Sequence, residues 1–430
     1  MPTTSHRRFR TLTAALGLVL VLSTAACGGS GESGGKTTIT FANWAYAEDA
    51  TQAGIKDLVE KFEKDNPDVK VKMEAISFTD IAHKVLLEAR SGNAPDVTQI
   101  AGNDLFSLSE ANLLEPLDEH MSDEYRKSII PAELKLGQIG GEQVAAPWTV
   151  TPFGFWYNKK LMKQAGLDPN KPPATMDDLL DAMKTVKQKL PGVTPIGMDA
   201  TNRSFGLDSC WSFMKTFGGE PFTDKKATAS SDGMEQYLEF MRTVGQNKYT
   251  QLNKKIGDFR PIAAENKLAF MWDGPYLQTV VEQTAKMSSE EFYKTWGVTT
   301  LPEGPAGEAY SAPTDHQLAV LKSSENKEAA WKFVEYLSTS QEGMKYIMTT
   351  GSSVPAVAEP GGAAAKLSDT PVFDAFRDDL VPTVSRPAWG PGYGKAYSPV
   401  MAGVQSAMTT DKPIADITGS MQKQVESALR

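Results

Sequence analysis

The stretch KFEKDNPDVKVKMEAI, residues 61–76, contains the end of a helix followed by a complete strand. The residues before Asn66-Pro67 place apolar side chains at helical spacing, and this pair ends the helix because proline cannot continue it. From Val69 to Ala75, apolar and charged residues alternate, which predicts a strand with one buried face.

The segments on either side of this stretch repeat the same two patterns. Residues 37–45 read as a strand before the helix, while residues 79–92 read as a second helix and 94–102 as a third strand. This βαβαβ order, within about 65 residues, predicts a parallel sheet covered by helices. Ligands of such sheets usually bind at the carboxyl ends of the strands.

A second α/β region is expected after about residue 150. Residues 153–158 and 193–200 read as strands, and Thr175 is expected to cap a helix with Asp178 in the capping-box position. The chain after residue 296 looks like a return to the first region. The sequence therefore predicts two α/β bodies connected by more than one segment.

The N-terminus has the organisation of a secretion signal. Three arginines precede an uncharged apolar run, and small residues then lead to Cys27, which resembles a bacterial lipobox. Lipoboxes usually carry leucine where this chain has Thr24, so cleavage near Ala26 with an unmodified Cys27 is the alternative. Residues 27–36, rich in glycine and serine, are expected to form a flexible tether.

Composition excludes several classes of function. The chain of 430 residues has a formal net charge of −9, so it lacks the cationic excess that nucleic-acid binding requires. It has two cysteines, and Cys210 is expected to be an apolar core residue. No histidine- or cysteine-based metal motif, GxSxG motif or complete phosphate loop is present, and no cofactor is expected. A glycosidase pair of carboxylates remains an open alternative.

Several tryptophans stand beside polar residues at expected strand ends or in loops. They are Trp44, Trp148, Trp272 and Trp389. An aromatic ring can cover the apolar face of a sugar while carboxylates and arginines bind its hydroxyls, so this pattern favours a carbohydrate site. The alternative for each tryptophan is a place in the core.

The chain resembles the family 1 extracellular solute-binding proteins of bacterial ABC importers, the maltose-binding-protein-like group. The resemblance lies in the order of four sets of segments over roughly 350 residues. They are KFEKDNPDVKVKMEAI with APDVTQI, FWYNKKLMKQAGLDP with PPATMDDLLDAM, AFMWDGPY with WGVTTLPEGPAG, and NKEAAWKFVEYLSTSQEGMKYIMTTGSSVPA. It implies two lobes, each a mainly parallel sheet with flanking helices, that close on a ligand at a hinge (the Venus-flytrap fold).

This resemblance predicts how the chain is divided. The expected segments are a signal peptide at 1–26, a tether at 27–36, lobe 1 at 37–147, lobe 2 at 148–295, a return to lobe 1 at 296–350, and a C-terminal helical segment at 351–430 that packs mainly on lobe 2.

The resemblance also implies ligand-binding positions, to which His316 is added because it stands beside Asp315 before a strand. The predicted residues are Trp44, Asn103, Asp104, Trp148, Thr149, Trp272, Asp273, Tyr276, His316, Arg386, Trp389 and Tyr393. Tyr276 stands where maltose binders carry tryptophan, which argues against maltose itself but not against a sugar.

The predicted function is that of a non-enzymatic, monomeric lipoprotein that captures a carbohydrate, expected to be an oligosaccharide, and delivers it to an ABC permease. Lipid on Cys27 would hold it at the outer face of the cytoplasmic membrane. Two alternatives are the same fold binding a solute other than sugar, and a secreted carbohydrate-active enzyme.

Overall fold

The computed structural model describes residues 36–78, 80–102, 104–223, 226–313, 315–350, 353–362, 364–367, 370–390 and 392–430. The predicted signal peptide, Cys27 and Asn103 lie outside these described residues. Within them, the strands form two main sheets, one of six strands and one of four. We call the parts of the chain built on them lobe 1 and lobe 2.

The six-stranded sheet of lobe 1 has the order β12-β6-β11-β3-β1-β2. The bounds are β1 Thr37–Asn43, β2 Val69–Ala75, β3 Val97–Ala101, β6 Ala146–Val150, β11 His316–Val320 and β12 Val354–Pro355. Strand β1 pairs in parallel with β2 and with β3, as the βαβαβ pattern predicts. Strand β11 is antiparallel to both β3 and β6, and β12 is antiparallel to β6.

The four-stranded sheet of lobe 2 has the order β10-β7-β9-β8. The bounds are β7 Gly154–Asn158, β8 Thr194–Gly197, β9 Leu268–Asp273 and β10 Trp296–Thr299. Strands β8 and β9 are parallel, while β7 is antiparallel to both β9 and β10. A small hairpin of β4 (Gln138–Ile139) and β5 (Glu142–Gln143) completes the described strands.

The prediction of mainly parallel sheets is therefore wrong for both lobes. A parallel neighbour requires a crossover connection within one sheet, usually through a helix. Strand β11 instead enters the lobe 1 sheet after β10 of the other sheet, and β7 of the lobe 2 sheet follows β6 of the lobe 1 sheet directly. Strands that arrive in this way run antiparallel to their neighbours, so the sheets are mixed.

The chain also passes from lobe 1 to lobe 2, and back again, at later residues than predicted. Strand β6 belongs to the six-stranded sheet up to Val150, so the first crossing follows Val150 and does not begin at 148. Strand β10 pairs with β7, so the return to lobe 1 comes between Thr299 and His316. Isolated β-bridges pair the connecting segments with one another. They lie between Pro152 and Pro313 and between Ser311 and Val384.

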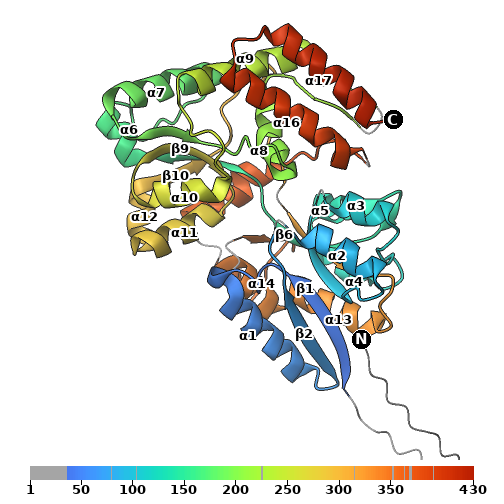
Figure 1. Ribbon diagram of the computed structural model, residues 1–430. Coiled ribbons are helices and arrows are strands. Elements are labelled where there is room, and N and C mark those ends of the chain that lie inside the picture. Colours follow the sequence, from blue (N-terminus) through green and yellow to red (C-terminus); the bar gives the residue numbers. More distant parts are fainter. Residues whose placement is uncertain are drawn as a thin grey trace, which may run out of the picture. The chain divides into compact units, whose positions relative to one another are not determined.

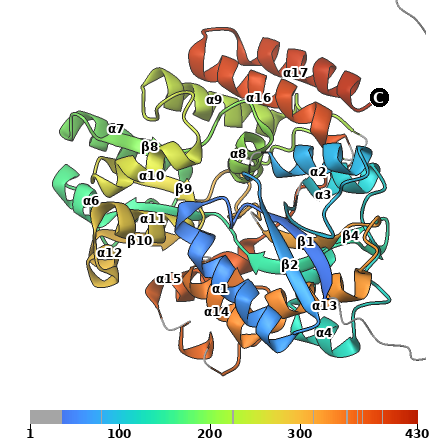
Figure 2. The same cartoon turned by 60° about the horizontal axis from the view of Figure 1, so that its bottom comes forward.

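Helices cover both faces of the lobe 1 sheet (Figures 1 and 2). Alternation along β1 directs Ile39 and Phe41 into one apolar cluster and Ala42 into another. The first cluster includes residues of α1 (Asp49–Asp65), α4 (Asp123–Ser128), α13 (Lys327–Thr339) and α14 (Gln341–Thr349). The second includes residues of α2 (Ile81–Arg90) and α3 (Asp104–Glu110). Helix α5 (Pro131–Leu136) contacts β6.

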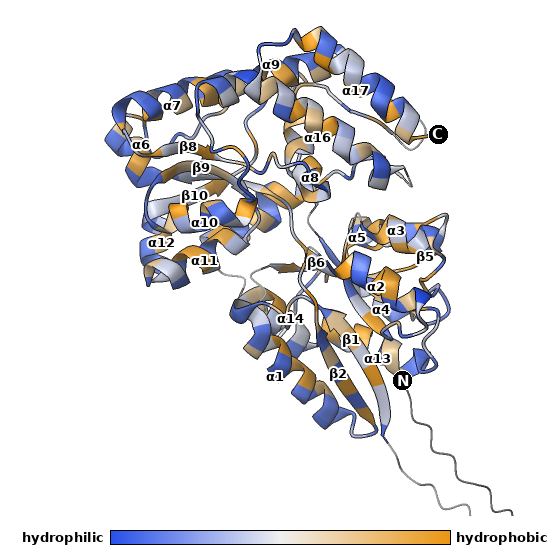
Figure 3. Cartoon of the chain, viewed as in Figure 1, coloured by the Kyte–Doolittle hydropathy of each residue, from blue (hydrophilic) through white to orange (hydrophobic). Residues whose placement is uncertain are grey.

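The helices of lobe 2 include the last two of the chain. They are α6 Lys159–Ala165, α7 Met176–Lys189, α8 Ser204–Thr216, α9 Asp232–Gln246, α10 Ile256–Ala264, α11 Tyr276–Ala285, α12 Ser289–Thr295, α16 Tyr393–Thr409 and α17 Ile414–Ala428. Thr175 and Asp178 form the predicted capping box of α7, with N–H···O distances of 3.1 and 3.0 Å. Apolar and polar residues alternate in bands along α17 (Figure 3), and its apolar face packs on α16 and α9.

The segment between β12 and α16 contains short elements. They are η1 (Ala364–Lys366), α15 (Pro371–Asp374), η2 (Ala375–Leu380, a π-helix) and η3 (Val381–Thr383). Helix η1 contacts α14 of lobe 1, whereas η2 contacts β10 of lobe 2. The C-terminal segment therefore contributes to both lobes, and from Tyr393 onwards it packs on α8 and α9.

Candidate functional site

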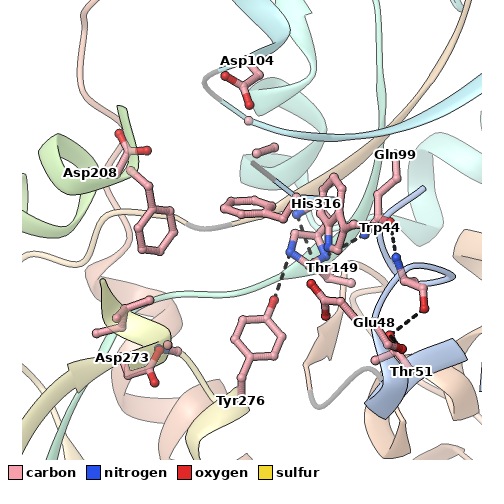
Figure 4. Close-up of a pocket in the computed structure, with 18 of the residues that line it drawn as sticks. Trp44, Glu48, Thr51, Gln99, Asp104, Thr149, Asp208, Asp273, Tyr276 and His316 are labelled. Carbon is pink, nitrogen blue, oxygen red and sulfur yellow. Dashed lines mark hydrogen bonds between the residues drawn. The ribbon is translucent and has the colours of Figure 1, made fainter. Parts of the chain in front are cut away.

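A cavity of about 640 Å³ is lined by residues of both lobes. This volume is within the range of ~300–1,000 Å³ that is usual for small-molecule sites. The strand ends supply much of the wall, since Trp44 follows β1, Gly102 follows β3 and Gly274 follows β9. Figure 4 shows Asp208 and Asp273 on the lobe 2 side of the cavity and Trp44, Gln99 and Thr149 on the lobe 1 side.

Aromatic rings connect the two sides of the cavity. Phe78, after β2, has its ring centroid 5.2 Å from that of Trp44 and 5.7 Å from that of Phe205 at the start of α8. Phe205 in turn lies 5.8 Å from Phe153, which stands between β6 and β7. Phe78, Phe205 and Tyr276 are partly exposed, so their rings are accessible to a bound molecule.

His316, the first residue of β11, joins the lobes through polar contacts. The Gln99 amide oxygen accepts from the Ala45 N–H at 3.4 Å, which directs its nitrogen to His316 Nδ1 at 3.3 Å. Since that nitrogen can only donate, Nδ1 accepts, and the Nε2–H donates to the Tyr276 hydroxyl at 3.1 Å. Tyr276 then donates to Thr151 Oγ1 at 3.4 Å. Burial lowers the pKa of His316 to about 4 although Asp315 opposes this, so the ring is neutral at pH 7.

The arginines that line the cavity are already paired with aspartates. Arg260 donates from Nε and Nη2 to the two oxygens of Asp273, at 2.8 and 3.0 Å. Its guanidinium also lies 5.7 Å from the centroid of the Tyr276 ring. Arg203 forms an ion pair with buried Asp199 and lies 4.9 Å from the centroid of the Phe205 ring. The charge of each guanidinium is therefore already balanced by a carboxylate of the protein.

Four further carboxylates line the cavity, among them those of Glu48, Asp104 and Asp208. Glu48 and Asp104 belong to lobe 1, and Asp208 belongs to α8. Burial raises the pKa of Asp104 to about 6, and desolvation raises the pKa of Glu48 while the charge of Arg260 opposes it. Asp208 Oδ1 accepts a hydrogen bond from the Tyr393 hydroxyl at 3.1 Å. The cavity thus combines accessible rings with hydrogen-bond acceptors.

Comparison with known proteins identifies the family. The model of the bacterial extracellular solute-binding proteins matches residues 45–344. The chain belongs to this family. Its members are binding proteins and not enzymes. Among the described residues, no helix combines the length and the apolar character needed to cross a membrane.

Individual relatives of this solute-binding protein are distant but extensive. The maltotriose-binding protein of Pyrococcus abyssi is 23% identical over 389 residues, covering 87% of this chain and 78% of the relative. The sn-glycerol-3-phosphate-binding periplasmic protein of Salmonella typhimurium is 24% identical over 361 residues, covering 78% and 77%. An ABC transporter solute-binding protein of Thermotoga lettingae, solved with alpha-D-tagatose, aligns with a TM-score of 0.80 at 21% identity, covering 92% of this chain and 100% of that one. The likeness confirms the two-lobed fold.

Most of the predicted ligand-binding residues line the cavity of this solute-binding protein. They are Trp44, Asp104, Trp148, Thr149, Asp273, Tyr276, His316 and Tyr393. Of these, Trp44, Trp148 and Tyr393 are at most 4% exposed, so each presents little of its ring to the cavity. Trp148 donates its indole N–H to Leu337 O at 3.1 Å and stacks on Tyr346.

Trp272 does not line the cavity, although its neighbour Asp273 does. Successive side chains of a strand point to opposite faces, so only one of two adjacent residues of β9 can face the ligand. Trp272 is fully buried and stacks on Phe153, with ring centroids 5.4 Å apart. Phe153 occupies the wall in its place.

Trp389 and Arg386 also lie behind the wall. Trp389 is 1% exposed, donates its indole N–H to Glu220 at 3.1 Å and stacks on Tyr393, which does line the cavity. Arg386 donates to both oxygens of Asp315, at 3.1 and 3.2 Å, and to Leu136 O. The structure therefore makes them supports of the wall.

Sequence reasoning missed several residues of the wall. They are Glu48, Phe78, Gln99, Phe153, Arg203, Phe205, Asp208 and Arg260. Phe78 and Phe205 follow the carboxyl ends of β2 and β8. Ligands of open α/β sheets usually bind at these strand ends, so both residues could have been predicted. No sequence pattern indicates Arg260, because it binds Asp273 only when α10 packs beside the end of β9.

Proposed function

We propose that this protein is the substrate-binding component of an ABC importer and that it captures a carbohydrate, expected to be an oligosaccharide, in the cavity between its lobes. The observation that carries the proposal is the set of partly exposed rings, Phe78, Phe205 and Tyr276, beside carboxylates in one cavity. Rings cover the apolar face of a sugar, and carboxylates accept hydrogen bonds from its hydroxyls. The maltotriose-binding relative supports the same ligand class.

A phosphorylated solute is the alternative that the glycerol-phosphate-binding relative raises. An anion of that kind needs uncommitted cations or free backbone N–H groups. In this cavity Arg203 and Arg260 are paired with Asp199 and Asp273, Lys255 is the one further cation of the described wall, and Glu48, Asp104, Asp208 and Asp258 add negative charge. The charges therefore favour a sugar without phosphate.

The contact between Phe78 of lobe 1 and Phe205 of lobe 2 suggests how the ligand acts. A ligand that touches both lobes binds the closed arrangement better than an open one and shifts the population accordingly. In this proposal the closed protein then docks on a membrane permease, and a lipid on Cys27 keeps the monomeric protein at the outer face of the cytoplasmic membrane. Replacing Cys27 by alanine should move the protein from the membrane fraction to the soluble fraction.

The proposal is tested by a thermal-shift screen of neutral mono- and oligosaccharides, with sn-glycerol 3-phosphate as the anionic comparison. A ligand at one hundred times its dissociation constant should add about 2.7 kcal/mol to the free energy of unfolding. Phe78→Ala and Phe205→Ala should weaken the response, whereas Leu252→Ala, at an exposed residue outside the cavity, should not. The ligand should be recovered intact after hours. No response to any sugar would refute the carbohydrate assignment.

A further inference from the structure

Behind the lobe 2 wall, Trp389 is held by two stacked rings and one carboxylate. Its ring centroid lies 5.0 Å from that of Tyr393, at an interplanar angle of 15°, and 5.5 Å from that of Phe222, at 28°. Its indole N–H donates to Glu220 Oε1 at 3.1 Å. Stacking fixes the plane of a ring but not its rotation within that plane, whereas a hydrogen bond at the ring edge is directional. Glu220 therefore fixes the rotation of Trp389 within the stack.

The end of α8 brings Glu220 back to this ring. Gly218 has a φ of +77°, and the N–H groups of Gly218 and Gly219 donate to carbonyl oxygens of the last turn of α8, each at 2.8 Å. The chain reverses here, so that Glu220 Oε1 also accepts the indole N–H of Trp211, on α8, at 2.9 Å. The other oxygen, Oε2, lies 3.6 Å from Lys215 Nζ. Burial raises the pKa of Glu220, and Lys215 and the two indole groups oppose the increase.

Tyr393 connects this arrangement to the cavity. Its ring stacks on Trp389, and its hydroxyl donates to Asp208 Oδ1 at 3.1 Å. Asp208 is partly exposed and lines the cavity, where Figure 4 shows its carboxylate on the lobe 2 side. The hydroxyl thus joins the first residue of α16 to α8. Whatever fixes the Tyr393 ring therefore also fixes one oxygen of a carboxylate at the wall.

We propose that Glu220 is a positioning residue of the binding site, which holds the aromatic stack so that the Tyr393 hydroxyl keeps the Asp208 carboxylate in one orientation toward the ligand. This inference rests on the proposed function, in which carboxylates of the wall accept hydrogen bonds from the hydroxyl groups of a sugar. A carboxylate that is oriented before binding loses less conformational freedom when the ligand arrives, so the affinity is higher. Glu220 does not line the cavity, so it acts without touching the ligand.

The test measures ligand affinity in variants that keep or remove the acceptor at position 220. Isothermal titration uses glucose, maltose, maltotriose and cellotriose, and the sugar that the wild type binds most tightly is titrated into every variant. Glu220→Leu, which lacks an acceptor, should bind at least about tenfold more weakly than the wild type. Glu220→Gln, whose amide oxygen can accept both indole N–H groups, should stay within about threefold of the wild type.

Glu235→Leu is the matched control. Glu235 is also a partly buried carboxylate of lobe 2, and it accepts a hydrogen bond from Thr418 Oγ1 at 3.2 Å, but it lies outside the wall, so its loss should leave the affinity unchanged. Melting temperatures show that each variant is folded. If Glu220→Leu does not fold, Trp389→Phe replaces it, because it removes an N–H that Glu220 accepts and keeps a ring in the stack. It should bind about threefold to tenfold more weakly than the wild type.

A double-mutant cycle separates positioning through Tyr393 from a general effect on stability. Tyr393→Phe removes the hydroxyl that holds Asp208 and keeps the ring. In this background the substitution at Glu220 or Trp389 should change the affinity by less than about threefold. An affinity that the substitution leaves unchanged in the wild-type background, or equal losses in both backgrounds, would overturn the inference and leave the carbohydrate proposal standing. If the wild type bound no sugar in a wide panel, both would be refuted.

Discussion

Of the arginine–aspartate pairs beside the cavity, two separate the charges that maintain the fold from those that form the binding wall. Arg386 pairs with Asp315 behind the wall, and Arg260 pairs with Asp273 at its surface. Both aspartates are almost fully buried. A second carboxyl accompanies each pair, Glu133 at the first and Glu48 at the second.

The pair behind the wall has several polar partners, although Arg386 Nε has none among the described residues. Arg386 Nη2 donates to both Asp315 oxygens and Nη1 donates to Leu136 O at 3.0 Å. Gln317 also donates to Asp315, at 2.6 Å. Arg386 thereby ties the segment after Val384 to lobe 1, close to the bridge between Ser311 and Val384. These charges maintain the arrangement of the connecting segments.

The pair at the wall has the better geometry but an open side. Arg260 uses two nitrogens for two oxygens, and the Gly274 N–H donates to Asp273 Oδ1 at 2.8 Å. The cavity adjoins both side chains, so water can reach either charge when its partner is removed. The same residue types therefore perform different tasks because their surroundings differ.

The largest effect is expected from removing either arginine. Arg386→Met leaves Asp315 charged and enclosed, which should lower the free energy of unfolding by about 3–5 kcal/mol. Arg260→Met leaves Asp273 beside the cavity, where water can replace part of the lost contact, and should cost about 1–3 kcal/mol. Chemical denaturation of both variants without ligand measures the difference. A cost for Arg260→Met equal to that for Arg386→Met would mean that the cavity does not hydrate Asp273.

A smaller effect is expected at the glycine that contacts each pair. A Cβ on Gly102 would lie 2.5 Å from Arg386 Nη2 and 2.9 Å from Asp315 Oδ1, and the pinned arginine has little freedom to move. Gly102→Ala should therefore cost about 1–3 kcal/mol. A Cβ on Gly274 would lie 3.1 Å from Tyr276 Cδ2 and 3.4 Å from Thr151 Cγ2.

Gly274→Ala is the matched control, and it should cost less than about 1 kcal/mol because the Tyr276 ring can shift toward the cavity. Melting temperatures of the two variants provide the measurement. If Gly102→Ala melts at the wild-type temperature, Arg386 has more freedom than its hydrogen bonds imply.

The frame was more predictable from sequence than the wall. The strand at Val69–Ala75 and the capping box at Thr175 were predicted from local patterns, and both are present in the structure, although the alternation of burial holds only from Val69 to Lys72. In β9, by contrast, all six residues are buried, so no polar alternation indicates that Asp273 and not Trp272 faces the cavity. Tryptophan is the residue type expected to contact a sugar, but the alternation of side chains along the strand points Trp272 away from the cavity.

Long-range pairing limited the rest of the prediction. Arg386 has a side chain suited to binding sugar hydroxyls, but it is paired with Asp315, which lies 71 positions earlier in the sequence. Glu133, the carboxyl that accompanies this pair, lies still earlier, on α5. Strand β10 has no feature in its own residues that assigns it to one sheet, since its place depends on pairing with β7. Such partners are set by the folded topology, which local spacing does not encode.

A further effect is expected from the accompanying carboxyls, and its dependence on pH distinguishes them. Burial raises the pKa of Glu133 from 4.5 to about 8, with a further increase from Asp315 and opposition from Arg386. The folded protein therefore keeps this proton up to about pH 8, while the unfolded chain loses it above 4.5. The stability contributed by the proton is complete below pH 4.5 and is lost as the pH rises toward 8 and beyond.

Glu133→Gln should abolish that loss, which has a maximum slope of about 1.4 kcal/mol per pH unit for one proton. Unfolding measured from pH 5 to pH 9 should thus show a flatter profile for Glu133→Gln than for the wild type, with nearly equal stability at pH 5. Glu48→Gln is the matched variant at the wall. Desolvation also raises the pKa of Glu48, but its side chain is exposed and Arg260 opposes the increase, so its profile should follow the wild type closely. If Glu48→Gln flattened the profile as much as Glu133→Gln, the carboxyl at the wall would be as isolated from water as the one behind it, and the distinction between frame and wall would fail.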